Sequence, residues 1–317
     1  MKRIKLILLT AAAGALLTGC FKEDYSMCRP EGNNVKLNFR LPDGNGGCTF
    51  LNDITEVHTA VYDAGGVLVK QLRSTETEHA VFKGVYMNLA PGTYKVICWA
   101  NSNGNTCLNR PEHCYTDSNA TIGYSSASGN RVGDCDPVYY GPNSVVTRTG
   151  NDRGEYVLTV GGDGHEGTVD FRYAHRIVEI YVKGYEENGV TTPPVELSGL
   201  PSGLSFLGMA PLTPENPVTS TMDSRVVTVR EEGQDVHYSL ARFRVFYFKA
   251  SDRSIGIDVL SPSNGRNVFH TTLNEWIDAG RDDPAQTQTL RLVIEFKGIT
   301  TEVRVPGWNS DDIGWGL

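Results

Sequence analysis

Residues 57–70 read VHTAVYDAGGVLVK, and this stretch decides the fold class. Strand-forming residues lie on both sides of Asp63-Ala64-Gly65-Gly66, which carries no strand signal of its own. Glycine readily adopts the positive φ angles that a tight turn between two strands requires. The stretch therefore predicts a β-hairpin whose turn lies at residues 63–66.

Strand patterns recur before and after this hairpin. In residues 33–41, NNVKLNFRL, apolar and polar residues alternate, as on a half-buried strand. Residues 89–101, LAPGTYKVICWAN, repeat the arrangement, with Pro91-Gly92 as the turn and Tyr94, Val96 and Cys98 on one face. Further strand patterns lie at residues 168–184, 237–250, 254–260 and 289–308, and only residues 271–280, TTLNEWIDAG, predict a short helix.

The length of the chain predicts two domains. A chain of 317 residues is longer than one core usually serves, and short strands at this spacing are typical of β-sandwiches. The polar stretch GGDGHEG at residues 161–167 precedes a fresh strand pattern. We therefore expect one sandwich over residues 34–165 and a second over residues 166–317.

Residues 101–151 are rich in Gly, Ser and Asn and predict long loops. Cys107, Cys114 and Cys135 are expected to cross-link these loops through disulfides. A metal site at Cys107 and Cys114 with His113 is disfavoured, because no second ligand pair completes it. The candidate disulfide cysteines are Cys28, Cys48, Cys98, Cys107, Cys114 and Cys135, whose fifteen possible connectivities the sequence does not distinguish.

The N-terminus has the three-part pattern of a secretory signal. Lys2, Arg3 and Lys5 precede an apolar run that ends in Leu-Thr-Gly-Cys at residues 17–20, which resembles a lipobox. The run is too short to span a bilayer, which takes roughly 20 apolar residues. Residues 1–19 are thus expected to be a lipoprotein signal peptide, with Cys20 acylated and residues 20–33 as a tether. The alternative is a plain signal peptide with a chance cysteine.

The charge of the chain disfavours nucleic acid as a partner. The net charge is −8, and removal of Lys2, Arg3 and Lys5 with the signal would make it about −11. No catalytic motif is complete either, because residues 123–127 lack the last glycine of a nucleophile elbow and the chain has no phosphate-binding loop. We expect no enzymatic activity, no metal and no cofactor.

Several local motifs together resemble the fimbrillin-A-associated anchor family, the FimB-type minor fimbrial subunits. They follow the lipobox and the acidic tether in order along most of the chain. The cysteine-rich residues 101–135 and the tail at residues 307–317 depart from that pattern. The motifs are Val61-Tyr62-Asp63 with Gly66, Leu89 with Pro91-Gly92-Thr93-Tyr94, Trp99-Ala100-Asn101, and Arg176 before Val178 and Ile180.

The resemblance implies two tandem transthyretin-like β-sandwiches held by lipid in the outer membrane at the base of a fimbria. It implies fimbrial shaft subunits as partners and strand addition as the mode of contact. Lys22, Glu23 and Asp24 resemble the charged tether that directs lipoproteins to the cell surface, although any soluble tether is charged.

Two questions about binding stay open at this point. Thr301, Glu302, Val303, Arg304 and Val305 alternate as a strand lent to a neighbour would, or as the last hairpin strand of their own domain. The alternative function is a surface lipoprotein that binds a glycan or a host protein through loops of the first domain. The aromatic residues considered for that role are Tyr115, Tyr124, Tyr139 and Tyr140.

Overall fold

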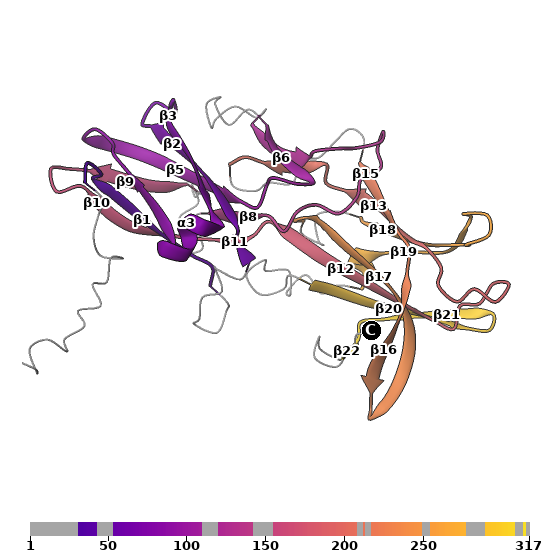
Figure 1. Cartoon of the computed structure of the whole chain (residues 1–317). Helices are drawn as coiled ribbons and strands as arrows, with labels where there is room; N and C mark the ends of the chain where they lie inside the picture. Colours follow the sequence, from indigo (N-terminus) through magenta and orange to yellow (C-terminus); the bar gives the residue numbers. More distant parts are fainter. Residues whose placement is uncertain are drawn as a thin grey trace, which may run out of the picture.

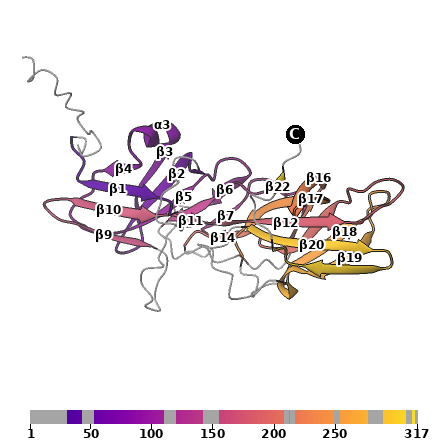
Figure 2. The same cartoon turned by 90° about the horizontal axis from the view of Figure 1, so that it is seen from below.

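The computed structural model describes residues 31–42, 53–109, 120–141, 155–207, 212, 217–248, 254–276, 289–307 and 313–314. These residues are almost entirely β-sheet, which confirms the all-β fold class. In Figures 1 and 2, the early strands lie at one end of an elongated molecule and the later strands at the other. No helix in the described ranges is long and apolar enough to cross a membrane.

The first half contains two sheets. One has the order β10-β1-β4, with β10 parallel to β1, and the other has the order β11-β8-β5-β2-β3, with β9 also paired to β5. Their strands are β1 (Val35–Arg40), β2 (Glu56–Asp63), β3 (Leu68–Thr75), β4 (Gly84–Met87), β5 (Gly92–Ala100), β8 (Tyr139–Gly141), β9 (Tyr156–Val160), β10 (His165–Asp170) and β11 (Arg172–Tyr173).

The β2–β3 hairpin is confirmed, and its turn has a clear chemical basis. The Asp63 carboxylate accepts a hydrogen bond from the Val67 N–H at 2.9 Å, and the Asp63 N–H donates to the Val67 carbonyl at 2.9 Å. Gly66 has a φ of +83°, which a residue with a Cβ rarely adopts. Aspartate and glycine at these positions therefore fold the turn.

The predicted alternation of β1 and β5 is also confirmed. Leu37 and Phe39 of β1 and Val96 and Cys98 of β5 are buried in one core between the two sheets. The strand before Pro91-Gly92 differs from the expectation, because β4 pairs with β1 rather than with β5. Residues 89–101 therefore link the two sheets instead of continuing a hairpin.

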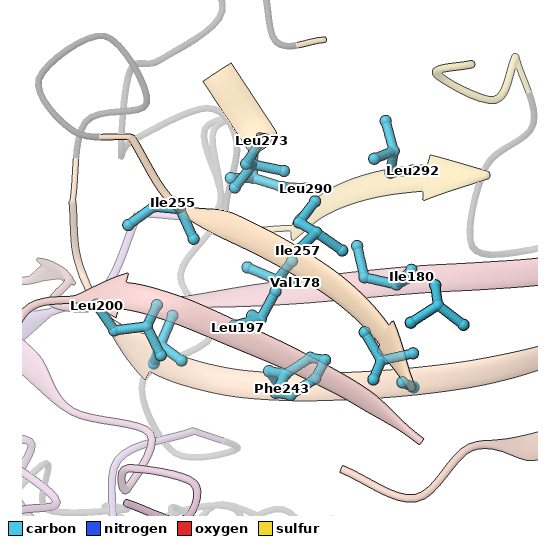
Figure 3. Packing of buried hydrophobic residues seen from close by; sticks show 14 of the residues in the cluster. Val178, Ile180, Leu197, Leu200, Phe243, Ile255, Ile257, Leu273, Leu290 and Leu292 are labelled. Atoms are coloured by element: carbon cyan, nitrogen blue, oxygen red, sulfur yellow. The ribbon is translucent and has the colours of Figure 1, made fainter. Parts of the chain in front are cut away.

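The second half contains a six-stranded sheet of order β21-β20-β12-β17-β16-β22 and a four-stranded sheet of order β15-β13-β18-β19. Figure 3 shows apolar residues of both sheets, among them Val178, Leu197 and Phe243, packed in one core. The strands are β12 (His175–Lys183), β13 (Val195–Leu200), β15 (Val218–Met222), β16 (Arg225–Glu231), β17 (Gln234–Phe246), β18 (Gly256–Leu260), β19 (Asn267–Thr272), β20 (Thr289–Lys297), β21 (Thr300–Arg304) and β22 (Ile313–Gly314).

A third sheet corrects the expectation of long loops after residue 101. It has the order β14-β7-β6, formed by β6 (Thr106–Asn109), β7 (Thr121–Tyr124) and β14 (Gly203–Ser205). β7 pairs antiparallel with β14 of the second half, and Gly203 permits this approach, since a Cβ there would lie 2.3 Å from the Ile122 carbonyl oxygen. The described part of the stretch thus joins the two halves.

An apolar cluster, here called the junction cluster, lies where the halves meet. Trp99 of β5 is fully buried in it, and the Trp99 Nε1–H donates to the Phe206 carbonyl at 3.0 Å. The Trp99 ring lies 4.9 Å from the ring of Tyr140. The buried members are Ala60, Tyr62, Ile97, Trp99, Ala120, Ile122, Cys135, Val138, Tyr140, Ala174, Leu204, Phe206, Phe246 and Tyr247.

Strand pairing changes from the first half to the second at Ala174. β10 pairs with β1 and β11 pairs with β8, whereas β12 pairs with β17 and β20. The predicted division between residues 165 and 166 lies within about ten residues of this point and stays a prediction.

Helices are short. The expected helix at residues 271–280 is represented by a 3-10 turn, η4 (Leu273–Glu275), while residues 277–280 lie outside the described ranges. One helix was not predicted, α3 (Glu76–Val81), which begins with a capping box between Thr75 and Glu78.

Candidate assembly surface

The C-terminal stretch forms the surface of interest, at the end of the molecule away from β1 (Figure 1). β20 and β21 form a hairpin whose turn contains Lys297-Gly298, as predicted, and Gly298 has a φ of +64°. β21 and β22 are the two terminal strands of the six-stranded sheet. The chain from residue 300 onward therefore contributes both edges of that sheet.

β21 contains the candidate donor residues Thr301, Glu302, Val303 and Arg304, and Val305 follows it directly. In this chain the strand pairs with β20 in a register that runs from Val293↔Arg304 to Lys297↔Thr300. None of its five residues is buried, whereas eight of the nine residues of β12 are. Only Val303 packs against the core, and it is partly buried. β21 is thus a peripheral strand of its own sheet.

Polar contacts hold β21 in place. The Lys297 ammonium donates to the Glu302 carboxylate, and this hydrogen bond lowers the pKa of Glu302 and raises the pKa of Lys297. At the other end of the strand, Arg304 Nη2 donates to Glu231 Oε1 at 2.9 Å and to the Tyr238 hydroxyl at 3.0 Å. The Lys297–Glu302 pair is about half exposed and contributes little to stability because water screens it, whereas the Arg304–Glu231 pair is more shielded.

A cavity of about 900 Å³ lies beside Arg304, between the β16–β17 turn and the ends of β12 and β20. Its lining is charged and of mixed sign. The ionisable residues around it are Lys183, Arg230, Glu231, Glu232, Glu295 and Arg304.

A buried carboxylate cluster lies on the outer face of the same sheet, away from its core. Glu179 is 4% exposed and accepts from Arg291 Nε at 2.8 Å, Arg242 Nε at 3.2 Å and the Tyr181 hydroxyl at 3.1 Å. Burial, followed by the charge of Glu179, raises the pKa of Tyr181. Sequence reasoning missed this cluster, because its members come from three strands whose order in the sheet differs from their order in the chain.

Cys20, Lys22, Glu23 and Asp24 lie outside the described residues, as do the candidate disulfide cysteines Cys28, Cys48 and Cys114.

The other three cysteines are free, which corrects the expectation of disulfides at Cys98, Cys107 and Cys135. Cys98 points into the first core, where its Sγ lies 3.6 Å from the Thr59 hydroxyl and burial raises its pKa to about 12. Cys135 is buried in the junction cluster. Within the described ranges, no three His, Cys, Asp or Glu side chains gather as metal ligands would.

Of the tyrosines considered for glycan binding, Tyr139 and Tyr140 lie in the protein interior. Tyr139 and Tyr140 of β8 are 3% and 0% exposed. The Tyr124 ring packs against Phe246 at 4.6 Å, and its hydroxyl is buried. Tyr115 lies outside the described residues. Tyr139 and Tyr140 therefore offer no exposed ring to a sugar.

Comparison with known families gives a match over most of the chain. The sequence profile of the fimbrillin-A associated anchor proteins Mfa1 and Mfa2 matches residues 25–314. This match confirms the resemblance inferred from the local motifs. A search of curated protein sequences found no match.

Solved structures share the fold at low sequence identity. The fimbrial anchor protein Mfa2 from Porphyromonas gingivalis is similar with a TM-score of 0.61 and 12% identity, over 86% of this chain and 97% of that one. A Bacteroides thetaiotaomicron protein described provisionally as an adhesin gives a TM-score of 0.63 and 14% identity, over 89% and 97%. These likenesses concern the fold.

Proposed function

The chain belongs to the family of fimbrillin-A associated anchor proteins, and we propose that it fastens a fimbrial shaft to the outer membrane through lipid at one end and strand addition at the other. The family is one of fimbrial anchors rather than of enzymes, which associates the chain with fimbriae at the cell surface. The observation that carries the proposal is the family match over residues 25–314.

Cys20 is the proposed membrane attachment point. The Cys20 thiol would be acylated and residues 1–19 would be cleaved off, so that the cysteine becomes the first residue of the mature chain. Each buried CH₂ contributes about 0.8 kcal/mol, so two or three acyl chains hold a protein at a membrane where one does not. Lys22, Glu23 and Asp24 would direct the protein to the outer surface, which protease treatment of intact cells would test.

The proposed contact with the first shaft subunit is β21. Three features support it: β21 is at the edge of its sheet, it has no buried residue, and it lies away from the N-terminal half of the molecule. Leaving β20 would expose little apolar area. Backbone ladder bonds in a partner's groove would then replace the ladder to β20.

The test measures whether the anchor and the fimbriae are in the membrane or in the medium. It uses one variant without the lipid site and one without the proposed donor strand. With Cys20→Ala, anchor and fimbriae are expected together in the medium, because their joint is intact. With Thr301 to Leu317 deleted, the anchor is expected to stay in the membrane while fimbriae appear in the medium without it. Fimbriae that remain on cells carrying the deletion would contradict strand addition through β21.

A milder pair of variants guards against misfolding, since the deletion also removes β22. Val305→Asp places a charge at a half-exposed position next to β21, and Ile299→Asp makes the same change at a fully exposed position in the preceding turn. Both proteins are expected to melt as the unaltered protein does. Only Val305→Asp is expected to release fimbriae, and equal retention by both would argue against the proposal.

A further inference from the structure

A second cavity, here called the junction cleft, lies where the β6–β7 hairpin of the first half meets β13 and β15 of the second. It has a volume of about 770 Å³, within the range typical of small-molecule sites. Residues from both halves line it, so it exists only because the halves are joined. The polar residues around it are Asn109, Thr121, Asn130, Ser198, Ser202 and Thr219.

None of the described residues that line the junction cleft carries a charged side chain, although the chain has a net charge of −8. The cavity beside Arg304 is the opposite case, with charges of both signs around it. An ionic ligand would find no counter-charge among these described lining residues. A neutral ligand avoids the cost of desolvating a charge without a partner.

Several polar groups of the cleft are available to a ligand. Within the described ranges, the side chains of Asn130, Ser198, Ser202 and Thr219 make no hydrogen bond with protein. Asn109 Nδ2 donates to the Thr121 hydroxyl at 3.3 Å, which holds the hairpin side of the cleft. Amides and hydroxyls together both donate and accept, as recognition of hydroxyl groups requires.

The remaining lining suits the carbon skeleton of such a ligand. Tyr124, Val132 and Pro217 supply apolar surface, and Gly123 has no side chain that would occupy the cleft. A Cβ at Gly123 would have ordinary contacts, 3.5 Å from Asn109 Nδ2 and 3.7 Å from the Ser202 carbonyl oxygen. The absence of a side chain at Gly123 therefore opens space that a ligand can occupy.

We propose that the junction cleft binds a neutral oligosaccharide. Hydroxyl groups without charge match the uncharged amides and hydroxyls of the cleft, and the apolar face of a sugar ring matches Tyr124 and its apolar neighbours. The site shares Tyr124 with the loops first considered but differs from them because both halves contribute lining residues. It is independent of strand addition, which concerns β21 at the far end.

The test is an equilibrium titration of the whole chain with neutral tetrasaccharides of glucose, mannose, galactose or N-acetylglucosamine. Saturable binding of at least one is expected, with a dissociation constant of about 0.1–1 mM. Sialylated and uronic-acid oligosaccharides are expected to bind at least about tenfold more weakly. No saturation by any neutral sugar, or preference for the charged ones, would overturn the proposal.

Matched variants locate the binding. Gly123→Leu fills the cleft and is expected to weaken binding at least about tenfold, whereas Gly162→Leu, at an open position in the β9–β10 turn, leaves it unchanged. Thr219→Val removes one hydroxyl at nearly constant shape and is expected to weaken binding several-fold, with the exposed Thr168→Val as its control. Binding that survives both Gly123→Leu and Thr219→Val in folded protein would place the sugar elsewhere and refute the assignment.

Discussion

Different interactions stabilise the two ends of the second half. Where it meets the first half, fully buried rings surround Trp99, and the Trp99 Nε1–H has a backbone acceptor. At the far end, β21 has no buried residue and is held by Lys297–Glu302 and by Arg304. Apolar burial stabilises far more than exposed ion pairs do. Apolar burial thus holds the two halves together, whereas β21 is held by its ladder to β20 and by ion pairs.

Trp99→Ala should have the largest effect. It leaves a cavity in the junction cluster and deprives the Phe206 carbonyl of its donor, so the free energy of unfolding should fall by about 3–5 kcal/mol. Urea unfolding measures this loss. Val157→Ala, at an exposed position on β9, should stay within about 0.5 kcal/mol, and similar losses in both variants would remove the contrast.

Acid pH should have the second-largest effect on stability, because it protonates a buried histidine at the junction. Burial lowers the pKa of His175 from 6.5 to about 4, while its Nδ1 lies 2.9 Å from the Val138 carbonyl oxygen. The unfolded imidazole takes up a proton below pH 6.5 and the folded one only near pH 4. Stability from this group is therefore complete above pH 6.5 and declines as the pH falls to 4, by about 3 kcal/mol in total. Urea unfolding across that range measures the decline, and His175→Gln should flatten it.

Glu179→Gln should give an intermediate loss, because it leaves Arg242 and Arg291 without their buried carboxylate. Both arginines are partly exposed, so we expect about 1–3 kcal/mol rather than the value for a fully buried pair. Thermal unfolding would show it. An unchanged melting temperature would mean that water already satisfies the two arginines.

The smallest loss is expected at the far end. Val303→Ala should lower the free energy of unfolding by about 0.5–1 kcal/mol, since the side chain is only partly buried. The matched change at the junction, Leu204→Ala, should lower it by about 2–5 kcal/mol, because Leu204 is fully buried. Equal losses in urea unfolding would contradict the distinction between the two ends.

Local patterns predicted local structure well. The alternation of Leu37 and Phe39 and the glycines after Asp63 were enough for β1 and for the β2–β3 hairpin, since both depend on near neighbours in the chain. The sequence did not predict which strands that are distant in the chain pair with each other. Nothing in the composition of residues 101–151 indicates that β7 pairs with β14.

The candidate site shows the same limit. The hairpin containing Val303 was predictable, but β22 is too short to leave a pattern, and its pairing with β16 depends on the tertiary fold. The cysteine count suggested disulfides at Cys98 and Cys135, yet a count does not say which side chains meet. Both residues are small and apolar enough to serve as core residues.

The parallel pairing of β1 with β10 governs when the first half can complete its fold during synthesis. Arg40 and Asp170 face each other in this pair although they are 130 residues apart, and closing so long a loop slows folding. A nascent chain that ends before His165 lacks the parallel partner of β1. The three-stranded sheet of the first half is therefore complete only once β10 has been made, shortly before the second half begins.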